Sequence, residues 1–107
     1  MSFEVQRVIA ADHPSLPGHF PGHPIVPGVV ILDEVARSLE EWQGGCQLTG
    51  IPAVKFIAPL RPDQPFTIRL TALDERQVQF RCTLHDQLLA QGRLEIDRGT
   101  RAANDGR

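Results

Sequence analysis

Five of the chain's nine prolines lie within fourteen residues, at positions 14, 17, 21, 24 and 27. Three of these prolines are followed by glycine, as Pro17-Gly18, Pro21-Gly22 and Pro27-Gly28. Because proline fixes φ at about −65° and glycine accepts positive φ, each pair favours a tight turn. The sequence therefore predicts a rigid loop here, rather than a flexible linker or a helix.

A single long helix is predicted to follow the loop, from about residue 29 to residue 43. Apolar residues recur at spacings of three and four and predict one buried stripe, while the polar residues lie on its flank and on the opposite face. The Gly44-Gly45 pair supplies the residue that a helix end requires in the left-handed region. The predicted stripe consists of Val29, Leu32, Val35, Ala36, Leu39 and Trp42, and the polar set of Asp33, Glu34, Arg37, Ser38, Glu40 and Glu41.

The remaining segments predict strands. They carry β-branched and aromatic residues in partial alternation, which is typical of a half-buried sheet. One helix among antiparallel strands indicates an α+β class, and a chain of 107 residues is long enough for one core. We therefore expect a single domain over residues 1–97 and a disordered tail over 98–107. The predicted strands are 3–10, 52–60, 65–73, 77–84 and 88–96, with turns at 61–64 and 85–87.

Composition excludes several classes of function. The formal net charge is −2 with both signs interspersed, which gives no indication of binding to nucleic acid or to a membrane surface. Cys46 and Cys82 have neither disulfide-framework nor metal-site spacing. His19 and His23 have an H-x3-H spacing, but the intervening prolines prevent the helix that would bring both rings to one metal ion. With no signal peptide or transmembrane segment expected, we predict a cytoplasmic protein.

Three residues around the loop and the helix start would suit acid–base chemistry on an acyl thioester. An unperturbed histidine side chain has a pKa close to physiological pH, so His19 would suit the role of base. Gly28, at the start of the helix, would offer an unpaired backbone N–H to an oxygen that develops negative charge. Asp33 would act as an acid if desolvation keeps it protonated, or would orient a water molecule if it is ionised. Residue types alone leave both possibilities for Asp33 open.

The segment HFPGHPIVPG, residues 19–28, followed by Val29-Val30-Ile31-Leu32-Asp33, resembles the signature of bacterial 3-hydroxyacyl-acyl-carrier-protein dehydratases of the FabA and FabZ types. The histidine, the glycine nine residues on and the acid fourteen residues on match the spacing of that signature. VKFIAPLRPDQ, residues 54–64, also resembles a later strand and turn of the family, although Arg61 and Pro62 alter the turn. The resemblance covers about residues 3–96.

The resemblance implies a hotdog fold, in which an antiparallel sheet wraps around one central helix. It implies that His19 is the catalytic base, that Asp33 is the acid and that the carbonyl of Ile25 orients the His19 ring. The N–H of Gly28 would hold the thioester carbonyl, with Phe20 and Val29 as further substrate-binding residues; for Phe20, packing in the core is an equally good reading.

The same resemblance implies an active unit that is a homodimer, or a hexamer built from dimers, with the site at the dimer interface. The histidine of one subunit would then face the acid of the other. The expected partner is acyl carrier protein, whose phosphopantetheine carries the substrate, and no further cofactor or metal is expected.

Some residues depart from the family pattern. Arg37 replaces the usual glutamine four residues after the acid, and a cation there favours the ionised form of Asp33. Glu34 stands where the family tends to have a small residue, and the chain has no tyrosine. These departures suggest a specialised member from a secondary pathway such as aryl-polyene synthesis. They also leave two alternatives open: a hotdog acyl-thioesterase, or a non-catalytic hotdog subunit of a dehydratase heterodimer.

Overall fold

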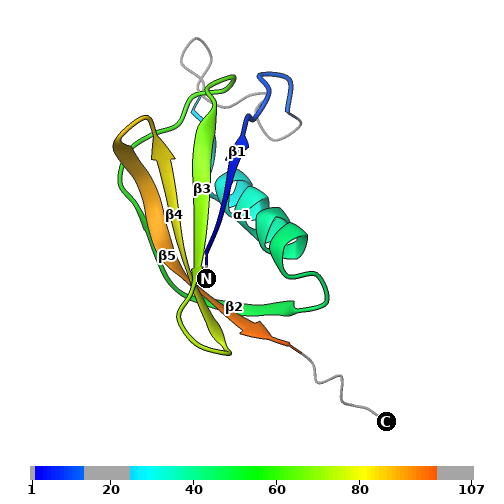
Figure 1. Cartoon of the computed structure of the whole chain (residues 1–107). Helices are drawn as coiled ribbons and strands as arrows, with labels where there is room; N and C mark the ends of the chain where they lie inside the picture. Colours follow the sequence, from blue (N-terminus) through cyan, green and yellow to red (C-terminus); the bar gives the residue numbers. More distant parts are fainter. Residues whose placement is uncertain (1, 14–24, 99–107) are drawn as a thin grey trace.

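A computed structural model of the chain describes residues 2–13 and 25–98. The predicted loop prolines at 14, 17, 21 and 24 and the predicted tail beyond Arg98 lie outside the described residues. The described elements are β1 (Ser2–Arg7), α1 (Gly28–Trp42), β2 (Gln47–Phe56), β3 (Phe66–Ala72), β4 (Gln77–Leu84) and β5 (Gln87–Asp97). The prediction of an α+β class with one helix is confirmed for this part of the chain (Figure 1).

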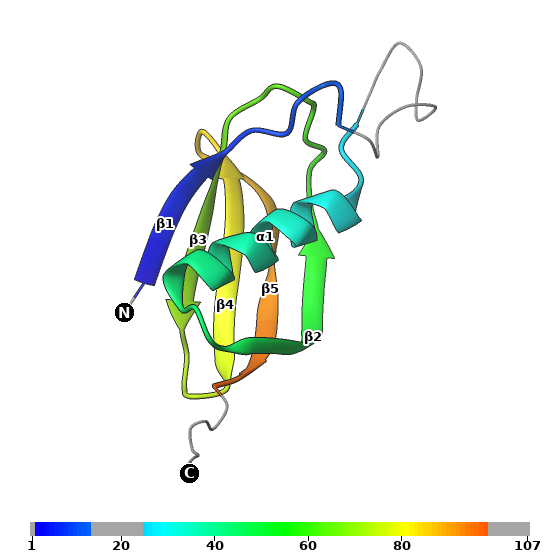
Figure 2. The same cartoon turned by 90° about the vertical axis from the view of Figure 1, so that its right-hand side faces the viewer.

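The strands form one antiparallel sheet in the order β1-β3-β4-β5-β2. Figure 2 shows α1 lying across one face of this sheet. Strand β2 runs beneath the helix from its C-terminal end and then turns up beside its N-terminal part. Two register shifts in the pairing of β2 with β5, between Leu48 and Gly50 and between Gly50 and Ala53, accompany this bend. The sheet therefore curves around the helix, and β1 and β2 are its two edges.

The core fills the space between α1 and the inner face of the sheet. Alternate residues of the central strands are buried there, as the period of two in a strand requires. Phe66 and Phe80 are the largest fully buried side chains, and Val35 and Ser38 are the most buried residues of the helix. The buried residues of β3 and β4 are Phe66, Ile68, Leu70, Val78, Phe80 and Cys82, and those of α1 are Val30, Ile31, Val35, Ser38 and Leu39.

The predicted apolar stripe of the helix was wrong at its first residue and missed three buried residues, although Trp42 at its other end does pack against the core. Val29 is 71% exposed, whereas Val30, Ile31 and Ser38 are buried. The cause is the unbroken apolar run at the helix start, within which periodicity cannot identify the buried face. Ser38 is accommodated among apolar side chains because its hydroxyl donates a hydrogen bond to the carbonyl of Glu34, at 2.9 Å.

The predicted strand at 52–60 also had the wrong boundaries, because β2 begins at Gln47 and ends at Phe56. Beyond Phe56 the chain leaves the ladder, and the carbonyl of Leu89 accepts hydrogen bonds from the N–H groups of both Ile57 and Ala58. The predicted turns are confirmed by residues in the left-handed region, Asp63 with φ 65° and His85 with φ 55°. Gly45, with φ 96°, follows the helix end as expected.

Gly92 of β5 lies where no side chain fits. A Cβ atom there would lie 2.2 Å from the carbonyl oxygen of Ala53 and 2.7 Å from the ring of Phe80. We therefore expect Gly92→Ala to lower the free energy of unfolding by about 1–3 kcal/mol, measured by urea denaturation. Gly50→Ala is the matched control, because its nearest neighbour is a flexible Glu95 side-chain atom at 3.4 Å. Equal losses for the two variants would contradict this account.

Candidate active site

Helix α1 begins at Gly28, directly after Pro27, which is extended with φ −61° and ψ 146°. The Pro27 carbonyl accepts hydrogen bonds from the N–H groups of Val30 and Ile31. Within the described part of the chain, no oxygen accepts a hydrogen bond from the N–H of Gly28 or Val29. These are the groups that a helix start leaves without intrahelical partners, at the positive end of the helix dipole. The first turn of α1 therefore offers backbone donors to an anionic or polarised oxygen.

An open hollow of about 420 Å³ lies beside this first turn. It is bounded by the helix start on one side and by the end of β2 and the segment after it on the other. Backbone donors beside an apolar recess are the combination that a thioester with a hydrocarbon chain requires. The lining residues are Ile25, Val26, Gly28, Ile31, Phe56, Ile57, Ala58, Pro59 and Leu60.

The ring of Phe56 explains why residue 28 is a glycine. A Cβ atom on Gly28 would lie 2.6 Å from the ring, inside van der Waals contact. Phe56 itself is 47% exposed, so its ring closes the space over the helix start while keeping one side open. Glycine thus serves packing as well as leaving the N–H accessible.

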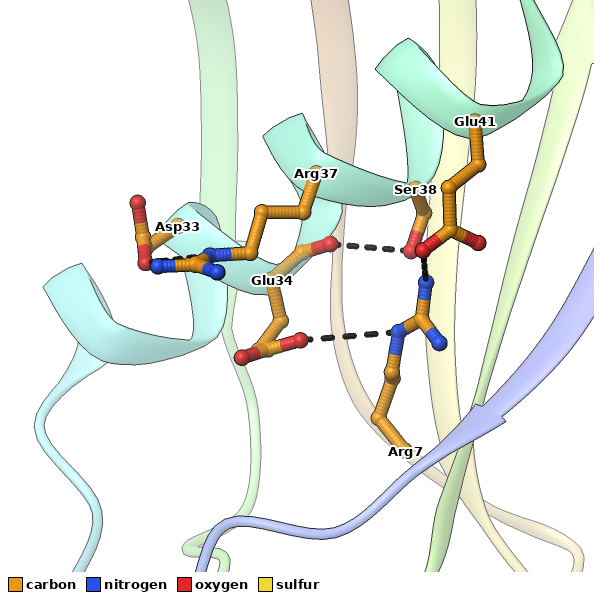
Figure 3. A network of polar contacts seen from close by, with 6 residues as sticks. All are labelled: Arg7, Asp33, Glu34, Arg37, Ser38 and Glu41. Atoms are coloured by element: carbon orange, nitrogen blue, oxygen red, sulfur yellow. Dashed lines mark hydrogen bonds and ion pairs between the residues drawn. The ribbon is translucent and has the colours of Figure 1, made fainter.

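Asp33 lies on the other side of the helix. At about 100° per residue, its position is rotated ~140° from Gly28, away from the sheet. Its side chain is 58% exposed and accepts a hydrogen bond from the Nε of Arg37, at 3.1 Å, as in Figure 3. Asp33, which the sequence analysis placed in the polar set of the helix, therefore lies on its exposed face. Within one chain, the hollow and the Asp33 carboxylate are not brought together.

Arg7, at the end of β1, forms a contact that the sequence analysis missed. Its guanidinium makes ion pairs with Glu34, at 3.5 Å, and with Glu41, at 2.5 Å, and so joins β1 to the helix (Figure 3). Two of its nitrogen atoms are buried, and neither contact has good hydrogen-bond geometry. The sequence did contain a pattern that predicts this contact. Arg7 alternates with Phe3 and Val5 and so lies on the inner face of β1, toward the helix. Glu34 stands where the dehydratase signature tends to have a small residue, and its contact with Arg7 explains the acid at this position.

The other predicted site residues are placed as follows. His19 and Phe20 lie outside the described residues, and so does His23. Ile25 lines the hollow, while the expected contact of its carbonyl with His19 stays a prediction. The exposed Val29 does not line the hollow.

Neither cysteine supplies a nucleophile. Burial raises the pKa of the Cys82 thiol to about 12, and burial is also the largest cause of the raised pKa of Cys46. Thiolate is the reactive form, and a raised pKa disfavours it. Over residues 2–13 and 25–98, no group of three metal-ligating side chains comes together. The one described helix is too short and too polar to cross a membrane.

Comparison with protein families gives a match over residues 1–93 to the family described as ApeI-like, ApeI dehydratase. A 3-hydroxyacyl-acyl-carrier-protein dehydratase FabZ of Chloroflexus aggregans is 36% identical, over 83% of this chain and 70% of that protein. The FabZ of Syntrophobacter fumaroxidans is 28% identical, over 80% of this chain and 67% of that protein. With FabZ proteins of Haemophilus influenzae, the match covers only 53% of the relative's length.

Solved structures share the fold. A subunit of the dehydratase heterocomplex ApeI:P from Xenorhabdus doucetiae superposes with a TM-score of 0.78 at 28% identity, covering 89% of this chain and 86% of that one. The 1,4-dihydroxy-2-naphthoyl-CoA thioesterase Slr0204 of Synechocystis gives a TM-score of 0.67 at 17% identity, covering 90% and 80%. The expected hotdog fold is thereby confirmed.

The contact between Gly28 and Phe56 can be tested by a double-mutant cycle. Gly28→Ala should lower the free energy of unfolding by about 1–3 kcal/mol, because the added methyl overlaps the ring. In a Phe56→Ala background the same substitution should cost at least about 1 kcal/mol less. Chemical denaturation of the four proteins measures this coupling. Additive losses would show that the ring does not require glycine at this position.

Proposed function

The chain belongs to the ApeI-like dehydratase family, and we propose from this premise that it removes water from a 3-hydroxyacyl thioester carried on acyl carrier protein. The product is the trans-2-enoyl thioester. The single observation that carries the proposal is the pairing of the Gly28 N–H, for which the described residues supply no acceptor, with an apolar hollow at the start of α1.

Each step of the elimination has a candidate group. The imidazole of His19 takes the proton from the carbon next to the thioester carbonyl, and the electron pair moves onto the carbonyl oxygen. The N–H of Gly28 stabilises the negative charge on that oxygen, and one such preorganised donor typically contributes about 3–4 kcal/mol. The 3-hydroxyl then leaves with a proton supplied by Asp33 or by a water molecule that Asp33 orients. The acyl chain occupies the hollow lined by Ile31 and Phe56.

The position of Asp33 supports a dimeric active unit. Because this carboxylate lies on the far side of α1 from its own hollow, it is available to the hollow of a second subunit. Strand β2 is an edge of the sheet and, with the residue after it, exposes a run of large apolar side chains that a second subunit would cover: Leu48, Val54, Phe56 and Ile57. Arg37, whose Nε donates to the carboxylate, is the residue that orients Asp33. A homodimer, or a hexamer built from dimers, fits these observations.

The proposal also covers the carrier of the substrate, the pathway and the location of the protein. The substrate arrives on the phosphopantetheine of acyl carrier protein, and no other cofactor is required for the elimination of water. The match to the ApeI-like family supports a role in a secondary pathway such as aryl-polyene synthesis. A cytoplasmic location stays a prediction from the sequence.

The assignment of the base and the acid is tested by His19→Ala and Asp33→Ala. Each should lower the turnover of a 3-hydroxyacyl substrate on its carrier at least about a hundredfold, and turnover is measured as the rate of enoyl formation. Asp33 is exposed and makes only a surface ion pair, so its loss should change the free energy of unfolding by less than about 0.5 kcal/mol. Glu40→Ala, which removes another exposed acid of α1, is the matched control and should keep full activity. Full activity in the His19 variant would overturn the assignment of the base.

The same assay separates hydrolysis from dehydration. A thioesterase would release free thiol from saturated and 3-hydroxylated thioesters alike, whereas a dehydratase forms enoyl product and leaves the thioester intact. The presence of His19 in the motif argues for dehydration, because hydrolysis by a hotdog carboxylate does not need a histidine.

A second candidate function is supported by the structural neighbour from the ApeI:P heterocomplex. A chain of this fold would then be one subunit of a heterodimer and would lack turnover alone. The purified chain should be assayed by itself and with a candidate second subunit. Activity that appears only in the mixture, together with a heterodimer in sedimentation, would favour this candidate over the homodimer.

A further inference from the structure

The face of the sheet that points away from α1 carries a row of charged and polar side chains. In the strand register, Lys55 of β2 lies opposite Gln91, Gln91 opposite Arg81, Arg81 opposite Arg69, and Arg69 opposite Glu4. Directly paired residues of an antiparallel sheet lie on the same face, so this row crosses all five strands. Arg93 lies in the next row, opposite Ala53 and Gln79.

In the central rows of this face the basic side chains exceed the acidic ones, while the acids Glu95 and Asp97 lie on the same side toward the end of β5. Lys55, Arg69, Arg81 and Arg93 are all exposed, and they define what we call the basic face. Among the described residues, its one ion pair joins Arg69 to Glu4, with 3.9 Å between nitrogen and oxygen. Since the chain as a whole has a formal charge of −2, this excess is a local segregation of charge.

The pairing of Arg69 with Arg81 is unfavourable for the fold by itself. Like charges that lie directly opposite each other on neighbouring strands destabilise a sheet. Arg93, two residues along on the next strand, adds a third cation within reach of Arg81. A partner that brings negative charge would relieve this repulsion on binding.

We propose that the basic face is a docking surface for an acidic protein and, resting on the proposed function, that this protein is the acyl carrier protein that delivers the thioester. A hollow of about 530 Å³ lies around Arg69 and Arg81 and is also lined by Glu4, threonines and His85, so it presents these two cations to the acidic side chains of a docked protein. The row ends at Lys55, the residue before Phe56, which lines the hollow beside Gly28. The docking surface and the proposed acyl site therefore lie on opposite faces of edge strand β2, next to each other along the chain.

The test uses Arg81→Glu in the full chain, with Arg76→Glu as the matched control. Both change the charge by the same amount, but Arg76 lies in the turn between β3 and β4 rather than in the row. Arg81→Glu places a carboxylate opposite Arg69, so the variant should melt no lower than the wild type. Binding of purified carrier protein is measured by calorimetry at low and high salt. Turnover is measured with a carrier-bound substrate and with a short soluble thioester of the same acyl group.

The proposal expects Arg81→Glu to weaken carrier binding at least tenfold and to lower kcat/KM for the carrier-bound substrate to a similar degree. Turnover of the soluble thioester and all values for Arg76→Glu should stay at the wild-type level. Wild-type carrier affinity should fall as salt is raised. Arg93→Glu should reproduce the loss.

Two results distinguish a failure of the docking proposal from a failure of the proposed function. Unchanged carrier binding in both row variants would show that the basic face is not the docking surface, while turnover of the soluble thioester would leave the proposed function standing. Carrier binding that requires the row, without turnover of either substrate, would support docking and contradict the dehydratase activity.

Discussion

The packing of α1 against the inner face of the curved sheet fixes the position of every functional group described above. The buried residues of the helix place its first turn beside the end of β2, and this contact creates the hollow at Gly28. The same packing turns Asp33 outward on the opposite side of the helix. Rotating the helix by half a turn about its axis would bury Asp33 and expose the apolar residues of α1. The hydrophobic effect therefore determines the orientation of the helix.

The ion pairs of Arg7 reinforce this orientation. A buried guanidinium on the inner face of β1 requires negative charge nearby, and Glu34 and Glu41 supply it from α1. With Glu34 occupied in this way, Arg37 remains for Asp33 on the exposed side of the helix. One helix thus carries two ion-pair sets with different tasks: one joins the helix to the sheet, and the other orients the carboxylate to which the proposed chemistry assigns a role.

The two faces of the molecule differ in charge. Acidic residues gather on α1, where Asp33, Glu34, Glu40 and Glu41 outnumber the single Arg37, whereas basic residues predominate in the central rows of the outer face of the sheet. The formal net charge of −2 does not reveal this separation of charges. Proposals about partners therefore depend on strand register, which determines which charges become neighbours, and not on the net charge.

Local patterns in the sequence were sufficient for the class, the single helix, four of the five strand positions within a few residues, and the turns at Asp63 and His85. Short-range chemistry determines these features: alternation in strands, glycine after a helix, and turn residues between strands. The motif from His19 to Asp33 also identified the family, because its spacing is itself a sequence property.

The tertiary structure decided what depends on contacts between distant residues. The continuous apolar run at 29–32 could not identify the buried face of the helix, and only packing against the sheet selected Ile31 over Val29. The reason for glycine at position 28 lies in Phe56, and the reason for Glu34 lies in Arg7, each more than twenty residues away. Such pairs exist only once the sheet has closed around the helix, because no local pattern records which residues that closure brings into contact.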